Sequence, residues 1–413
     1  MTDSAIEFLF ALERFGMKFG LDSMRVLCAA LEHPERAFTS IHIAGTNGKG
    51  SVSAMLDAIL RAGGHRTGRY TSPHLVRIEE RFVVDGEAID GGRLESSAAK
   101  VRAIVEGFVA DGTFDAPPTF FECTTAVAFD LFRNAGVELA TVEVGLGGRL
   151  DATNVLEPAA TAIVSIDFDH QAQLGTTLTS IAREKAGIAK AGVPMILGPL
   201  PDQARAAIQD VCAAVGAPIV RADTSSLLDR AAALPLGLAG AHQISNAAVA
   251  ICLAETLESG GVPLGETAIG TGLTTVRWPG RLESFELEGR RVIIDAAHNP
   301  AGARALASYL RDVVSEPVTL VFGAMRDKAI DEMLSILAPR ADTIICTTAA
   351  SPRAMPAAEI AEIARAVHAN VRAIENPFAA LEAALRLDRT AVVAGSIFLI
   401  GPLRERVYRG ILR

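Results

Sequence analysis

A glycine-rich segment at residues 45–51 constrains the fold of this 413-residue chain more than any other feature. It follows the apolar run 41–44, which is typical of a buried strand, and precedes residues 52–60, whose composition indicates a helix. Glycines let consecutive backbone N–H groups face one point, where the helix N-terminus adds partial positive charge. Lys49 adds a full charge, and the Ser51 hydroxyl can reach Mg²⁺. The pattern predicts a triphosphate-binding loop between a strand and a helix.

An ordinary glycine-rich turn is the alternative interpretation of this segment. The match to the common phosphate-loop pattern is imperfect, because Ile43 occupies the position of the usual first glycine and an extra glycine separates the lysine from the hydroxyl. The order of strand, glycines, lysine, hydroxyl and helix favours the phosphate loop. The loop residues are Gly45, Thr46, Asn47, Gly48, Lys49, Gly50 and Ser51.

Charge and composition limit the classes of function. The formal net charge of −9 leaves no basic excess to neutralise the phosphates of a nucleic acid, which argues against a nucleic-acid binder. A nucleotide needs only a local positive site. Hydrophobic residues make up 50% of the chain and charged residues 21%, as is typical of a globular protein. A length of 413 residues predicts two domains.

Cysteine use and the N-terminal residues predict the compartment. The five cysteines are scattered without a CxxC spacing and most lie in apolar runs, so we expect buried thiols in a reducing environment. The first seven residues lack the basic and long apolar regions of a signal peptide, and no apolar stretch approaches the length of a membrane span. These patterns predict a cytoplasmic protein without membrane association, and we expect a monomer.

Strand-like and helix-like runs alternate over most of the chain, which predicts an α/β fold with parallel sheets covered on both faces. A break at residues 277–281, where proline and glycine interrupt the pattern, separates expected domains at 1–279 and 280–413. Ligands in such folds lie at the carboxyl ends of strands. We expect strands at 140–144, 161–166, 193–197, 291–295, 318–322, 343–346 and 390–394. We expect helices near 119–134, 178–190, 201–215, 245–258, 300–314, 329–338, 356–369 and 378–386.

Four polar residues of the first predicted domain are candidates for a metal site. Glu143 ends an otherwise apolar strand, where it either holds Mg²⁺, which prefers hard oxygen ligands, or reaches solvent. His170 follows the next strand and is either a metal ligand or a structural histidine. Ser72 either offers an oxygen to a metal or belongs to an ordinary turn. Lys185 lies late in a helix and either faces this site or is solvated.

The second predicted domain has a polar strand end of its own. Asp295 and His298 lie at the carboxyl end of the first long strand there, and Pro300 suits the start of the following helix. Both residues are functional candidates, with a structural role as the alternative. Arg281, just past the break, either reaches phosphates or is a surface arginine of the linker.

Together these motifs resemble those of the folylpolyglutamate synthase/dihydrofolate synthase family of the Mur ligase superfamily. The resemblance runs in order over nearly the whole chain, and the run from Glu143 to Asn154 is nearly diagnostic. It implies a P-loop-containing parallel-sheet N-terminal domain and a smaller Rossmann-like α/β C-terminal domain. The matching pieces are residues 45–51, 71–75, 121–122, 143–154, 169–170, 184–188, 242–247, 279–281, 295–300 and 322–328.

The resemblance implies a role for each piece. Besides the loop, the residues that contact ATP would be Asn246, Arg281 and Asp295. Two Mg²⁺ sites would use Ser51, Ser72, Glu143, His170 and a carbamylated Lys185. The catalytic residues would be Lys49, Lys185 and His298, the last near the incoming glutamate. The folate or pteroate would contact Leu21, Asp22, Ser23, Met24, Thr119, Phe120, Phe121, Glu122, Leu150, Asp151 and Ala152.

The implied activity is that of an ATP-dependent ligase with L-glutamate, ATP and dihydropteroate or a reduced folate as substrates. The acid would form an acyl phosphate with the γ-phosphate of ATP, and the amine of glutamate would displace phosphate; we expect both dihydrofolate synthase and folylpolyglutamate synthase activity. One alternative is a Mur-type ligase acting on a nucleotide-linked cell-wall precursor, although the 44 residues before the loop leave no room for its usual additional domain. The other is a P-loop switch without ligase chemistry, against which the second domain argues.

Overall fold

The computed structural model describes residues 4–16, 18, 20–287, 289–387 and 390–411. The chain divides into two compact units, of which the first comprises Met1–Gly237 and Ile244–Val276 and the second Leu238–Gln243 and Arg277–Arg413. The division lies at the edge of the segment where proline and glycine interrupt the pattern. The short segment 238–243 also groups with the second unit, although it precedes that break.

The first unit contains an eight-stranded sheet in the order β4-β3-β2-β5-β1-β6-β7-β8. Strands β2, β5, β1, β6, β7 and β8 are parallel, while β3 and β4 form an antiparallel edge. The strand carrying the glycine-rich loop therefore lies inside the sheet, between β5 and β6. The strands are β1 Thr39–Ala44, β2 Thr67–Tyr70, β3 Phe82–Val84, β4 Glu87–Ala88, β5 Leu139–Glu143, β6 Ala160–Ile163, β7 Met195–Leu197 and β8 Ile219–Arg221.

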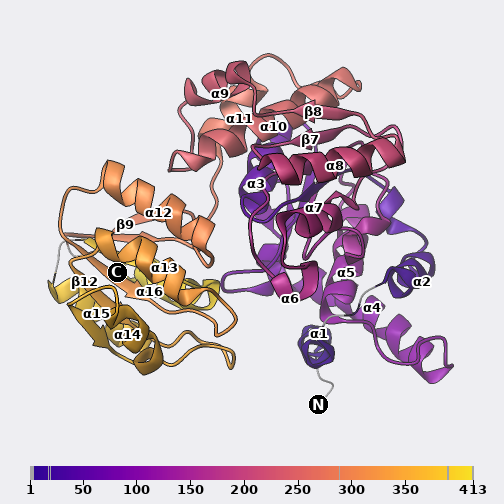
Figure 1. The fold of residues 1–413 in the computed structure, drawn as a ribbon. Helices are drawn as coiled ribbons and strands as arrows, with labels where there is room; N and C mark the ends of the chain where they lie inside the picture. The colour runs from indigo at the N-terminus through magenta and orange to yellow at the C-terminus, as the bar shows by residue number, and fades with distance from the viewer. Residues whose placement is uncertain (1–3, 17, 19, 288, 388–389, 412–413) are drawn as a thin grey trace. The chain divides into compact units, whose positions relative to one another are not determined.

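Helices cover both faces of this sheet (Figure 1). Ala140 and Val142 of β5 pack in one apolar cluster with α5, and α7 and α8 pack over β6 and β7. Thr141 points to the opposite face, since side chains alternate along a strand, and its hydroxyl donates to the Ser53 carbonyl of α3. The helices of this unit are α1 Ala5–Ala11, η1 Leu12–Phe15, α2 Asp22–Ala30, η2 Pro34–Arg36, α3 Lys49–Ala62, η3 Ile78–Arg81, α4 Gly91–Ala110, α5 Phe120–Asn134, η4 Ala152–Val155, α6 Gln171–Leu174, α7 Leu178–Ala186, α8 Asp202–Val215, α9 Ser225–Ala232, α10 His242–Ser259 (whose first two residues group with the second unit) and α11 Ala268–Thr275.

The second unit contains a six-stranded sheet in the order β13-β12-β11-β14-β10-β9, in which β9 alone is antiparallel to its neighbour. Leu306 of α12, Met333 of α13 and Ile360 of α14 share one apolar cluster with Leu320 and Phe322 of β11. Helices α15 and α16 pack against β14. The elements are β9 Glu283–Leu287, β10 Arg290–Ile294, α12 Pro300–Val313, β11 Val318–Phe322, α13 Ile330–Leu337, η5 Ala338–Arg340, β12 Thr343–Cys346, α14 Ala357–Arg365, β13 Val371–Ala373, α15 Pro377–Leu387, β14 Thr390–Ala394 and α16 Ile397–Ile411.

The α/β fold class with two parallel-rich sheets is confirmed. Several predicted boundaries differ: the strand expected at 161–166 ends at Ile163, and the helix expected at 356–369 ends at Arg365. Two further differences have a local reason. The helix expected at 178–190 ends at Ala186, where Gly187 caps it, and the strand expected at 193–197 begins at Met195, after a proline that lacks a backbone donor. All five cysteines are buried free thiols, as expected. Within the described ranges, no helix has both the length and the apolar character that a membrane span requires.

Candidate nucleotide and metal site

The glycine-rich loop joins β1 to α3, and two of its glycines are required by geometry. Gly45 has a φ of +154° and Gly48, the N-cap of α3, a φ of +84°. A Cβ on Gly48 would lie 2.5 Å from Oδ1 of Asn246 and 2.8 Å from Cγ1 of Val164. The loop therefore passes too close to α10 and to the end of β6 for any side chain at this position. Asn246, predicted to contact ATP, is thereby placed beside the loop.

The loop is anchored on the segment that follows β6. The backbone N–H of Thr46 donates to the Ser165 carbonyl over 2.8 Å, and that of Asn47 donates to Ser165 Oγ over 2.9 Å. The Thr46 hydroxyl donates to the Asp167 carbonyl and accepts from the Asp167 N–H, over 3.1 and 3.0 Å. Two loop amides are thus used for anchoring, and the first-turn amides of α3 are those that helix geometry leaves without an intrahelical acceptor. Ser165 was missed as a site residue, although a polar residue ending a predicted strand was a usable signal.

Lys49 and Glu143 face each other beside the loop. The Lys49 ammonium donates to the carbonyls of Gly45 and Thr46 over 3.1 and 3.3 Å, and lies 3.8 Å from Oε1 of Glu143. The other carboxylate oxygen of Glu143 accepts the backbone N–H of Ser72 over 3.3 Å. Glu143 is buried and does not reach solvent. The structure therefore brings together a cation, a carboxylate and the Ser72 turn, as the sequence suggested.

Lys185 of α7 is also buried against the loop rather than solvated. Its ammonium donates to the carbonyl of Gly45 over 2.9 Å, the same oxygen that Lys49 uses. Burial and, to a smaller extent, the neighbouring Lys49 charge lower the pKa of Lys185 to about 7, against the opposing effect of Asp169 and Asp151. A large neutral fraction of this amine at neutral pH follows.

The remaining predicted metal ligands are less closely assembled. Ser51 is buried in the first turn of α3, two residues after Lys49. His170 has a φ of +49° and caps the short helix α6; its Nε2 lies 3.9 Å from Oδ1 of Asp169, and its side chain is 44% exposed. Among the residues that the structure describes, no three or more His, Cys, Asp or Glu side chains form a ready metal-binding group.

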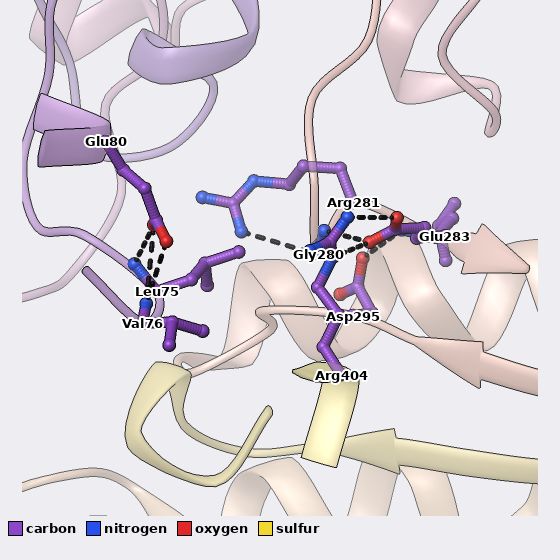
Figure 2. A network of polar contacts seen from close by, with 9 residues as sticks. Leu75, Val76, Glu80, Gly280, Arg281, Glu283, Asp295 and Arg404 are labelled. Atoms are coloured by element: carbon purple, nitrogen blue, oxygen red, sulfur yellow. Dashed lines mark hydrogen bonds and ion pairs between the residues drawn. The ribbon is translucent and has the colours of Figure 1, made fainter. Parts of the chain in front are cut away.

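The turn that carries Ser72 is held by a single carboxylate. Glu80 accepts the backbone N–H groups of Leu75 and Val76 over 2.7 and 3.2 Å (Figure 2). It also accepts the backbone N–H of Arg77 over 3.0 Å. Three donors on one carboxylate fix the backbone path of this turn. Ser72 is therefore positioned by the fold and not only by its contact with Glu143.

The predicted folate residues lie on three different elements. Thr119 and Glu122 form the N-terminal capping box of α5, in which the Glu122 carboxylate accepts from the Thr119 N–H and hydroxyl over 2.8 and 2.9 Å. Leu21 is the N-cap of α2, whose first residues Asp22, Ser23 and Met24 range from exposed to buried. Leu150, Asp151 and Ala152 lead into η4.

Aromatic rings surround the start of α5. Phe120 stacks on Phe10 with ring centroids 5.8 Å apart, and the Arg81 guanidinium lies over the Phe120 ring at 5.1 Å. Phe121 stacks on Tyr70 of β2 at 6.1 Å. The Arg81 Nε donates to His74 Nδ1 over 2.9 Å. This part of the first unit thus offers flat apolar faces next to a buried cation.

The second unit holds its predicted residues in a separate polar network. Asp295 accepts the N–H of Leu282 and that of Ala297, each over 2.9 Å. Glu283 accepts the Gly280 N–H over 2.9 Å and forms a two-fold ion pair with Arg404 over 2.7 and 2.8 Å (Figure 2). Both carboxylates thus fix the backbone on either side of Arg281.

Two further predicted residues of this unit are held by backbone carbonyls. Arg281 donates from one terminal nitrogen to the carbonyl of Gly280 over 3.2 Å. His298 Nδ1 lies 2.9 Å from the carbonyl of Ala296, which can only accept, so Nδ1 carries the proton. These two residues and Asp295 belong to the second unit, whereas Asn246 belongs to the first.

Comparison with known proteins defines the class of this fold. A family model described as Mur ligase, glutamate ligase domain matches residues 280–397. A phosphate loop on one α/β unit followed by a second unit of this type defines a Mur-type ligase fold. The dihydrofolate synthase/folylpolyglutamate synthase of Bacillus subtilis is 33% identical over 95% of this chain and 96% of its own length. The chain belongs to the folylpolyglutamate synthase/dihydrofolate synthase family.

Solved structures support the same assignment. One described as "E.coli FolC in complex with DHPP and ADP" has a TM-score of 0.86 and 30% identity, covering 99% of this chain and 98% of that one. A bifunctional folylpolyglutamate synthase/dihydrofolate synthase with Mn, AMPPNP and L-glutamate bound has a TM-score of 0.86 and 31% identity, covering 98% of each chain. Relatives from Halobacterium salinarum and Haloferax volcanii are named probable bifunctional folylpolyglutamate synthase/dihydropteroate synthase, and they are 36% and 35% identical over 98% and 83% of this chain. This chain spans about half the length of these two proteins, 51% of the first and 42% of the second.

Proposed function

We propose that the chain is an ATP-dependent ligase that joins L-glutamate to the carboxylate of dihydropteroate and of reduced folates. The observation that carries this proposal is the arrangement of Lys49 between the loop carbonyls and Glu143 at the start of α3. The names of the Bacillus subtilis relative and of the neighbours bound to nucleotide and glutamate support the choice of substrates. A monomeric state and a cytoplasmic location stay predictions.

The reaction requires cations because it brings anions together. A substrate carboxylate oxygen attacks the γ-phosphorus of ATP, the bond to the bridging oxygen breaks, and ADP leaves behind an acyl phosphate. The glutamate amine then attacks the acyl carbon, loses a proton and expels inorganic phosphate. Lys49 offsets the charge on the transferring phosphoryl group, and the first-turn amides of α3 bind phosphate oxygens.

A divalent cation fits the donors beside the loop. Glu143 and the hydroxyls of Ser51 and Ser72 are hard oxygen donors of the kind that Mg²⁺ prefers, and Glu143 is held in place by the Ser72 N–H. A bound cation would supply further positive charge at the triphosphate. We propose a second site that uses His170 and a carbamylated Lys185. The lowered pKa of Lys185 supports this, because only a neutral amine reacts with CO₂.

The other predicted contacts are part of the proposal. Asn246, Arg281 and Asp295 would bind the nucleotide, and His298 would lie near the incoming glutamate. The folate ring would lie among the residues of α2, the start of α5 and the 150–152 segment described above.

The test is phosphate release from ATP with each substrate omitted in turn. A ligase releases phosphate only when glutamate and either dihydropteroate or a reduced folate are both present, and mass spectrometry then shows the glutamyl product. Lys49→Ala is expected to lose turnover by at least 100-fold, whereas Lys100→Ala, a lysine that pairs with Asp130 away from the loop, keeps it. Phosphate release that needs neither acid nor glutamate would indicate a switch, and turnover only with a nucleotide-linked precursor would indicate the other ligase class. Full turnover by Lys49→Ala would refute the role of the loop.

Carbamylation has its own test. Incubation with ¹³C-bicarbonate should give a carbamate carbon signal in the wild type that is absent from Lys185→Ala. Lys185→Ala should lose activity and regain part of it with added small carboxylates. Wild-type activity of this variant without any added acid would rule out the carbamate.

A further inference from the structure

A buried polar chain connects the strand of the phosphate loop to the predicted folate segment. His42 lies in β1 and is completely buried, and its Nε2 lies 2.8 Å from the hydroxyl of Thr153. The Thr153 hydroxyl forms a short hydrogen bond with Oδ1 of Asp151. Thr153 and Asp151 are buried as well. The three side chains therefore form one line from β1 to the segment 150–152.

The direction of the protons in this line follows from the donors around Asp151. Its Oδ1 also accepts the Thr153 N–H over 3.1 Å, and its Oδ2 accepts the Leu146 N–H over 2.9 Å. Burial raises the pKa of the Asp151 carboxyl, and the hydrogen bonds from Thr153 and Leu146 oppose that rise. Because each of its two oxygens already faces a backbone N–H, Asp151 is the acceptor in this line. The single Thr153 hydroxyl proton must then point to Asp151, and the Thr153 oxygen must accept from His42. His42 is therefore the tautomer with its proton on Nε2.

The other imidazole nitrogen of His42, Nδ1, makes a histidine unfavourable at this strand position. Within the described part of the chain, Nδ1 of His42 is buried and has no hydrogen-bond partner. Burial, together with the charge of Lys190, lowers the pKa of His42 to about 3 and keeps the ring neutral. A buried nitrogen without a partner is unfavourable, so an apolar residue would suit this strand position better if packing alone mattered. The hydrogen bond that Nε2 donates to the Thr153 hydroxyl offsets the cost of burying Nδ1.

We propose that His42 is a positioning residue for substrate binding: its Nε2–H fixes the Thr153 hydroxyl, which holds the Asp151 carboxylate and the Gly145–Asn154 segment in the conformation that receives the pteridine-bearing acid. The inference rests on the proposed function, since it assigns Asp151 to the folate site. His42 does not touch the substrate and acts only through Thr153. The same segment lies against α7, where a Cβ on Gly148 would come within 2.7 Å of the Lys185 carbonyl. A shift of Asp151 would therefore disturb tightly packed backbone.

The test compares the affinities for the two substrates in variants that break the chain at one link. Thr153→Val keeps the volume of the side chain but removes the hydroxyl, and His42→Leu removes the donor. We expect each to raise KM for dihydropteroate at least 10-fold while KM for ATP changes less than 2-fold. His42→Gln, which restores an N–H donor, should recover most of the affinity. The double variant Thr153→Val/His42→Leu should be no worse than the poorer single variant, because one line is broken in both.

A matched control separates positioning from loss of a buried hydroxyl. Thr161 of β6 is equally buried and donates to the Pro194 carbonyl, outside the chain of three. Thr161→Val should lose stability in urea unfolding without a selective rise in the dihydropteroate KM. If Thr153→Val leaves that KM unchanged, or raises both KM values together, His42 is merely a core residue and the inference is wrong. If His42→Leu does not fold, Thr153→Val still decides. A wild type with no turnover of dihydropteroate would overturn the proposed function and this inference with it, whereas normal wild-type turnover with unaffected variants overturns the inference alone.

Discussion

Replacing Gly48 by alanine should separate two costs that the phosphate loop imposes on the backbone. The residue has a φ of +84°, a left-handed conformation that costs an alanine about 1–2 kcal/mol relative to glycine. Its new Cβ would also lie 2.5 Å from Oδ1 of Asn246 and 2.8 Å from Cγ1 of Val164. Overpacking of this kind costs about 1–3 kcal/mol. We expect Gly48→Ala to lower the free energy of unfolding by about 2–5 kcal/mol in total.

Gly64, just after the end of α3, is the matched control. Its φ is +86°, close to that of Gly48, yet a Cβ there would meet nothing within 4 Å. Gly64→Ala should therefore show the backbone cost alone, about 1–2 kcal/mol. The difference between the two variants measures the clash beside the loop. Where Asn246 moves aside to relieve that clash, the cost should appear in nucleotide binding instead.

The assay is urea unfolding of both variants together with calorimetric titration of AMPPNP. Gly48→Ala should bind the nucleotide at least 10-fold more weakly than the wild type, and Gly64→Ala within 2-fold of it. Equal stability of the two variants combined with unchanged nucleotide affinity of Gly48→Ala would refute the reasoning, because the close approach to α10 would then have no consequence.

Three further predictions concern buried charged or titratable groups. Lys185→Met should inactivate the enzyme yet raise its free energy of unfolding at pH 7 by about 4 kcal/mol without metal or bicarbonate, because a buried ammonium whose pKa falls from 10.5 to about 7 opposes folding. An active or less stable variant would contradict this. The pKa of His42 is about 3 in the folded chain and 6.5 in the unfolded chain, so the unfolded chain binds more protons between these values and the free energy of unfolding falls as the pH drops below 6.5. From pH 7 to pH 5 urea unfolding should show a loss of about 2 kcal/mol. The same loss in His42→Gln would refute the assignment. Asp57→Ala should lower the free energy of unfolding by about 3–5 kcal/mol in the same assay, because it removes the buried carboxylate that accepts from Arg69 over 3.0 Å. A loss below about 1 kcal/mol would show that this ion pair contributes little to stability.

The elements that could be predicted from the sequence are those with continuous apolar runs. The predicted strands at 318–322, 343–346 and 390–394 coincide with β11, β12 and β14, which are buried on both faces. Edge strands were missed, because β8 and β13 are half-exposed and carry arginine where a central strand carries apolar residues. The antiparallel strands β4 and β9 were missed because their residues are largely exposed or only partly buried, and β3 because it has only three residues. Pairing at an edge depends on a neighbour that local pattern does not reveal.

The site shows a similar division between local and tertiary information. The loop was recognisable because strand, glycines, lysine and helix are adjacent in the chain. Lys185 was placed at the site only by the family resemblance, since a lysine late in a helix is usually solvated and only the packing of α7 places its ammonium on the Gly45 carbonyl. His42 was passed over because its role depends on Thr153, 111 residues later in the chain, which local pattern does not reveal.

Two lysines and a carboxylate lie together beside this one loop. Lys49 and Lys185 both donate to the carbonyl of Gly45, and Oε1 of Glu143 lies 3.8 Å from the Lys49 ammonium. Gly48 sits in a left-handed conformation, and His42 buries a nitrogen that lacks a partner among the described residues. The buried nitrogen of His42 and the close approach of the two amines each oppose folding. The two amines at the start of α3 suit a site for a polyanionic nucleotide, because a bound triphosphate would supply negative charge beside them.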